Sequence, residues 1–151
     1  MPALFKILLV SHVIAGLLAI IASYAVWMGL LKRELSAKFL TRTSWFAAVM
    51  IWVSWLAGGY YYWAYYGQSV KTVIIQGRYA WAHSVFMESK EHVFLFLPFL
   101  YLVLAIVISG FSDRLTAQPD LKKQLALLAA INAILGIIIT LSGVVISGAV
   151  R

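Results

Sequence analysis

The sequence predicts an all-α integral membrane protein, a bundle of four transmembrane helices whose third helix extends beyond the membrane. Of its 151 residues, 64% are hydrophobic and only 11% are charged, whereas a soluble domain carries roughly a quarter charged residues. Four apolar segments are each long enough to cross a hydrocarbon core of ~30 Å. Most of the charged residues lie in or next to the connections. We expect a single transmembrane domain over residues 1–151.

The first expected span covers residues 3–31. Its apolar run is longer than a signal-peptide core and no cleavage site precedes a mature domain, so we expect a retained helix. Gly16, Ala19 and Ser23 follow His12 at helical spacing, and small residues on one face let a neighbouring helix approach closely. The second span, residues 44–67, is rich in Trp and Tyr. We favour membrane-surface anchoring for these rings over a stripe facing a flat cofactor or quinone.

The third expected span covers residues 92–112, with Pro98 inside it as the source of a kink. Residues 68–78 before it are expected to form a loop. Residues 79–91 are expected to extend the helix beyond the membrane, and they carry most of the polar chemistry of this region.

The fourth expected span covers residues 124–150 and follows a polar connection that contains Pro119. Asn132 is its one strongly polar side chain, and we expect it to form a hydrogen bond across a helix interface. Small residues form one face that suits tight packing, either inside the fold or against a partner: Ala129, Ala133, Gly136, Thr140, Gly143 and Ser147.

Basic residues predict the orientation. The net charge of +7 resides beside apolar spans, where Lys and Arg meet anionic lipid headgroups, so it indicates no nucleic acid. The two connections opposite the termini carry seven Lys or Arg residues, against five on the other side. The positive-inside rule therefore places both termini outside, and we expect the cytoplasmic membrane of a bacterium or archaeon. The absence of cysteine excludes disulfides, thiolate ligands and covalent haem attachment.

Two histidines suggest a cofactor. His12 lies twenty residues before Lys32, and His92 lies twenty-one before Asp113. At ~1.5 Å per residue, both imidazoles lie ~30 Å from the inner boundary, near the outer membrane face. Two imidazoles facing each other across a bundle are the ligands of a b-type haem, and electron transfer is the leading functional prediction. His83 is the substitute ligand. The alternative is that these histidines only bond to water, headgroups or neighbours.

The surroundings of these histidines also suit haem. Phe96 and Phe99 share the face of His92, and Gly16 leaves room beside His12. In span count and histidine depth, the layout resembles small four-helix haem-b membrane subunits of respiratory complexes. The resemblance includes no diagnostic motif, so it transfers no residue roles.

Acidic residues beside His92 allow two other sites. Glu88 and His92 share a helix face at a spacing of four, with Glu91 adjacent, and this set could bind iron, copper or zinc. Glu88 could instead orient a ligating His92, and a His–Glu pair could exchange protons with a quinone. The alternative is a solvated helix end in which these acids pair with Lys90.

A different class of function is also open. Small size, four spans and small-residue faces suit a cofactor-free accessory subunit that packs against a larger membrane complex or forms a homo-oligomer. The sequence contains no nucleophile elbow and no metalloprotease helix motif, so hydrolysis is not expected. No acid lies mid-span, which disfavours an ion pump.

Overall fold

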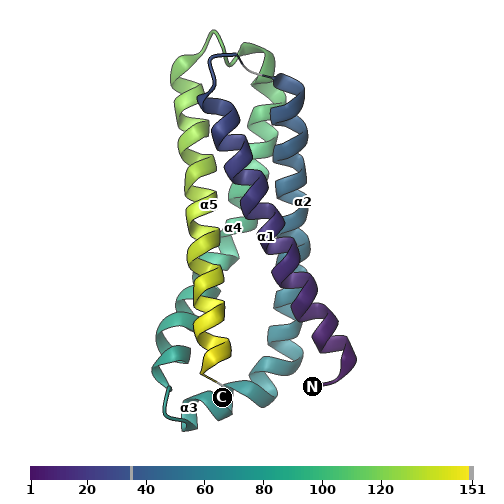
Figure 1. Cartoon of the computed structure of the whole chain (residues 1–151), viewed down its shortest axis with the longest axis vertical. Helices are drawn as coiled ribbons and strands as arrows, with labels where there is room; N and C mark the ends of the chain where they lie inside the picture. Colours follow the sequence, from purple (N-terminus) through teal and green to yellow (C-terminus); the bar gives the residue numbers. More distant parts are fainter. Residues whose placement is uncertain (35, 150–151) are drawn as a thin grey trace.

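The computed structural model describes residues 1–34 and 36–149, the side chain of Glu91 excepted, and this part of the chain is helical without strands. Four long helices run beside one another (Figure 1): α1 (Ala3–Leu31), α2 (Ala37–Tyr61), α4 (Glu88–Phe111) and α5 (Pro119–Gly148). The N-terminus, the short helix α3 (Lys71–Gln76) and the end of α5 share one end of the molecule, hereafter the α3 end. The all-α prediction is confirmed.

Three helices are long and apolar enough to cross a membrane: α1, the continuous helical run Ala82–Arg114, and α5. This finding is compatible with an integral membrane protein. The fourth long helix, α2, carries Trp and Tyr where its neighbours carry aliphatic residues. These rings have lower hydropathy, although they are common at membrane surfaces.

The two connections at the far end are shorter than expected. Ser36 caps α2 by accepting a hydrogen bond at Oγ from the backbone N–H of Phe39, so α2 begins at Ala37. Pro119 occupies the first turn of α5, where its missing N–H costs nothing, so it begins a helix there. The Lys122 ammonium donates to the carbonyl of Lys32 at 2.8 Å and joins the two connections.

The expected loop over residues 68–78 is wrong. A π-helical segment, η1 (Tyr62–Val70), continues α2 and leads into α3, and a second one, η2 (Ala82–Met87), leads into α4. Apolar side chains of this region form their own buried cluster with the end of α5, which explains why it is ordered as helix: Tyr66, Ile74, Ala82, Met87 and Ile146.

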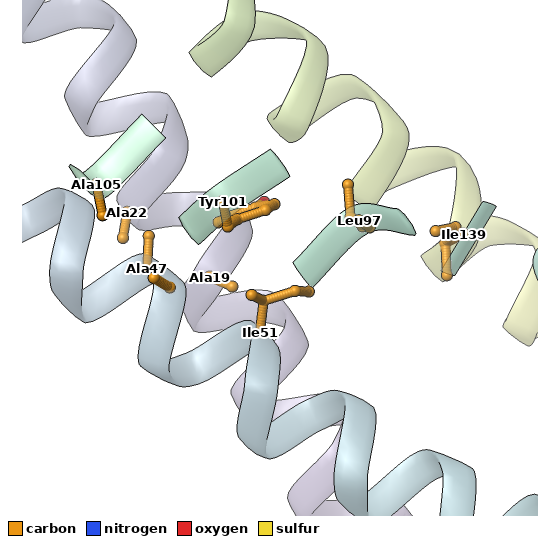
Figure 2. Close-up of a cluster of buried hydrophobic side chains, with 9 residues drawn as sticks. Ala19, Ala22, Ala47, Ile51, Leu97, Tyr101, Ala105 and Ile139 are labelled. Carbon is orange, nitrogen blue, oxygen red and sulfur yellow. The ribbon is translucent and has the colours of Figure 1, made fainter. Parts of the chain in front are cut away.

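Small side chains hold the long helices together. Ala19 and Ala22 of α1 lie against Ala47 and Ala48 of α2, and this pair of helices forms the largest interface. Tyr101 of α4 fills the space beside them (Figure 2). Alanine at these positions brings the helix axes close together, so dispersion contacts accumulate along the interface.

The small-residue face of α5 packs inside the fold. Ala129, Ala133 and Gly136 are buried, and a Cβ added to Gly136 would lie 2.5 Å from Ile20 Cγ1 of α1. The Ser23 hydroxyl donates to the carbonyl of Ala129 at 3.0 Å. This face was expected to pack either inside the fold or against a partner, and these residues pack inside the fold.

The expected side-chain bond of Asn132 is wrong. Its Oδ1 and Nδ2 are buried and have no hydrogen-bond partner in the described part of the chain. The bond across this interface comes instead from Tyr101 of α4, whose hydroxyl donates to the backbone carbonyl of Asn132 at 3.3 Å.

Candidate functional site toward the α3 end

His12 of α1 is held by Ser54 of α2. Its Nδ1 lies 2.9 Å from the Ser54 carbonyl oxygen and 3.0 Å from Ser54 Oγ, and that hydroxyl donates to the His12 carbonyl at 2.9 Å. A carbonyl oxygen only accepts, so Nδ1 carries the hydrogen. The neutral imidazole therefore presents an unprotonated Nε2, which can act as a base or as a metal ligand.

Two further residues define the position of the His12 ring. A Cβ added to Gly58 would lie only 2.5 Å from His12 Nδ1 and 2.8 Å from Cε1, so the ring occupies space that a glycine leaves open. On the other side, the ring of Phe94 in α4 meets it edge to face, with centroids 5.5 Å apart. His12 thus lies in the interior, between α1, α2 and α4.

Lys90 is a functional candidate that sequence reasoning treated as part of a solvated helix end. It is partly buried, and a Cβ added to Gly143 of α5 would lie 3.5 Å from its Nζ. The sequence did contain a signal: Phe94, Leu97 and Tyr101 follow Lys90 at helical spacing and form the inward face of α4.

His92 points the other way. Its side chain is exposed, and Nδ1 donates to the Glu88 carbonyl of its own helix at 2.7 Å, so in the neutral ring Nε2 is the nitrogen without a hydrogen. Phe94, two positions later and ~200° round the helix, contacts His12. The structure therefore does not bring His12 and His92 together. Phe96 and Phe99 are 66% and 51% exposed, so they form an outer surface and no interior wall.

His83 belongs to the helical turns at the α3 end. Its Nδ1 lies 3.0 Å from the Tyr66 hydroxyl, and the two rings stack with centroids 6.0 Å apart. The side chain is 4% exposed. The π-helical segments η1 and η2 bring this pair together, and π-helical turns are frequent at functional sites.

A metal centre gains no support from the geometry. Over the described residues, no three or more His, Asp or Glu side chains gather where they could hold a metal ion. In the expected set of Glu88, Glu91 and His92, the backbone carbonyl of Glu88 faces His92. The side chain of Glu91 lies outside the described part of the structure.

Comparison of the chain with protein-family models, with curated proteins and with solved structures finds no match.

Proposed function

We propose that all four long helices cross a lipid bilayer as a bundle and that the α4 helix extends beyond it through η2. Large apolar side chains face outward along α2 as they do along its neighbours, among them Phe46, Val49, Val53 and Leu56. A helix on the surface of a soluble bundle turns such residues inward. Lipid around all four helices accounts for this outward apolar surface.

The charge asymmetry favours placing the α3 end outside. The chain contains no cysteine, so single cysteines can report accessibility on an unlabelled background. A membrane-impermeant maleimide added to whole cells should label Gln76→Cys, and should label Ala117→Cys only after the membrane is opened. Labelling of both positions from outside would contradict four spans, and the reverse pattern would invert the orientation.

We propose that the function is electron transfer through one b-type haem bound near the outer face, with His12 as an axial ligand. The tautomer of His12 carries this proposal. Iron takes the lone pair of one ring nitrogen, and a ligating histidine usually donates its other ring N–H to a nearby acceptor. The Ser54 carbonyl is such an acceptor for Nδ1, which leaves Nε2 for the metal.

The second axial ligand remains a prediction, with His92 first and His83 as its substitute. His92 has the same tautomer as His12, held by the Glu88 carbonyl, and so also presents Nε2. Its ring lies on the exposed side of α4. Ligation by both histidines therefore requires the first turns of α4 to rotate from their position in this structure.

An optical spectrum tests the haem proposal. Protein purified after haem-replete expression should show a Soret band and, on reduction, α and β bands. His12→Ala should abolish them, and comparison of His92→Ala with His83→Ala identifies the second ligand. Phe94→Leu, which changes a ring neighbour but no ligand, is the matched control and should keep the bands. A colourless wild-type preparation would refute the proposal.

A cofactor-free accessory subunit is the second candidate. Exposed glycines favour it: a Cβ added to Gly59 or Gly110 would have nothing within 4 Å, so a partner helix can approach closely there. The expected contact face of α5 is less available, because Ala133 and Gly136 are used inside the chain. A colourless chain that is stable only beside partner subunits would support this reading.

A further inference from the structure

Lys90 lies in the first turn of α4, at the outer edge of the expected membrane span. Its side chain is on the inward face of α4, four residues before Phe94. A Cβ added to Gly143 of α5 would lie 3.5 Å from its Nζ. Glycine at 143 leaves room for the ammonium beside α5. A partly buried ionisable group that faces the interior of a bundle usually pairs with a partner or marks a ligand site.

No counter-charge faces Lys90 among the side chains that the structure describes. Among the residues that the structure describes, its ammonium forms neither an ion pair nor a hydrogen bond. Glu88 is exposed and lies two positions earlier, on the other side of α4. Asp113 lies at the far end of the same helix, ~35 Å away at ~1.5 Å per residue.

We propose that Lys90 binds the oxyanion, a phosphate or a carboxylate, of a membrane-soluble amphiphile. An ammonium donates short, charge-assisted hydrogen bonds to such an oxyanion, and the pair replaces the missing counter-charge. The apolar body of the ligand would lie in the hydrocarbon layer beside the helices, which distinguishes it from a small anion dissolved in water.

Two molecules carry this chemistry. One is an anionic phospholipid of the surrounding leaflet, and the other is haem, whose propionate groups are carboxylates. The haem source rests on the proposed function, whereas the phospholipid source is independent of it. Measurements on haem-free and haem-loaded protein therefore separate a failure of this inference from a failure of the haem proposal.

The phospholipid source is tested by native mass spectrometry on the full chain in an uncharged detergent. Phosphatidylglycerol and phosphatidylcholine with the same acyl chains are added at equal concentration, and the retained lipid is counted. A charge-assisted hydrogen bond corresponds to a preference for phosphatidylglycerol of about tenfold or more. Lys90→Met should remove this preference and Lys90→Arg should keep it. Lys6→Met, an exposed lysine on α1, is the matched control and should leave it unchanged.

The haem source is tested on haem-loaded protein. If Lys90→Met lowers haem retention or shifts the reduction potential while lipid retention stays equal, the oxyanion is a propionate. Each variant is first checked for wild-type helix content and a single size, and Lys90→Arg covers the case in which Lys90→Met misfolds. The proposal is overturned if neither lipid nor haem retention responds to Lys90→Met. It is also overturned if the preference for phosphatidylglycerol arises only in Glu91→Gln, because Glu91 would then be the counter-charge.

Discussion

Replacing Gly58 by alanine should displace the His12 ring and destabilise the protein. The added Cβ would stand 2.5 Å from Nδ1, 2.8 Å from Cε1 and 3.0 Å from Cγ of His12, all inside normal contact distance. The ring must therefore turn, or α1 and α2 must separate. Either movement breaks the bond from His12 Nδ1 to the Ser54 carbonyl.

The expected size follows from three contributions. Overpacking in an interior costs about 1–3 kcal/mol. The lost hydrogen bond adds about 0.5–1.5 kcal/mol. Alanine in a helix recovers about 1 kcal/mol relative to glycine. The free energy of unfolding of Gly58→Ala should therefore fall by about 0.5–3.5 kcal/mol.

Equilibrium unfolding in mixed detergent micelles, titrated with a denaturing detergent and followed by circular dichroism, measures this change. Gly59→Ala is the matched control, because a Cβ there would meet nothing within 4 Å and should leave stability equal or slightly higher. Adding Gly58→Ala to His12→Ala should cost little, since the ring that it strikes is gone. Equal stability of Gly58→Ala and Gly59→Ala would refute the reasoning.

Three other substitutions probe the interior in the same titration. Gly136→Ala should lower the unfolding free energy by about 1–3 kcal/mol, because its Cβ would lie 2.5 Å from Ile20, and adding Ile20→Ala should restore part of the loss. Tyr101→Phe should cost about 0.5–1.5 kcal/mol through the lost bond to the Asn132 carbonyl, and an unchanged midpoint would disprove that bond. Asn132→Leu removes an amide that has no hydrogen-bond partner among the described residues, so stability should hold or rise; a clear loss would mean that another molecule binds the amide.

Prediction was most successful where length and apolarity decide the outcome. The structure begins and ends α1 at Ala3 and Leu31, the range expected for the first span. Prediction was least successful between the second and third spans, where residues 68–76 are helical. These residues become helical because Tyr66 and Ile74 meet Ile146, a residue more than seventy positions away.

The candidate site shows a similar division. Counting residues places His12 and His92 at similar depth, because the rise per residue is constant along a helix. Counting along separate helices does not tell which way each residue faces relative to its neighbours. In the structure, His92 and Glu88 lie on the exposed side of α4, whereas Lys90 lies on the inward side. The interior partner of His12 is Ser54, which no spacing pattern singled out.

The sequence by itself determined the helical class and its apolar character. A segment in hydrocarbon must satisfy its backbone hydrogen bonds internally, so length and hydropathy alone indicate helices. Only the tertiary structure decided which polar groups face inward. Each residue turns a helix by ~100°, so a shift of one or two positions moves a side chain from the interior to the surface. That rotation is decided by the packing of the whole interface, where Gly58 and Gly143 leave the spaces that His12 and Lys90 occupy.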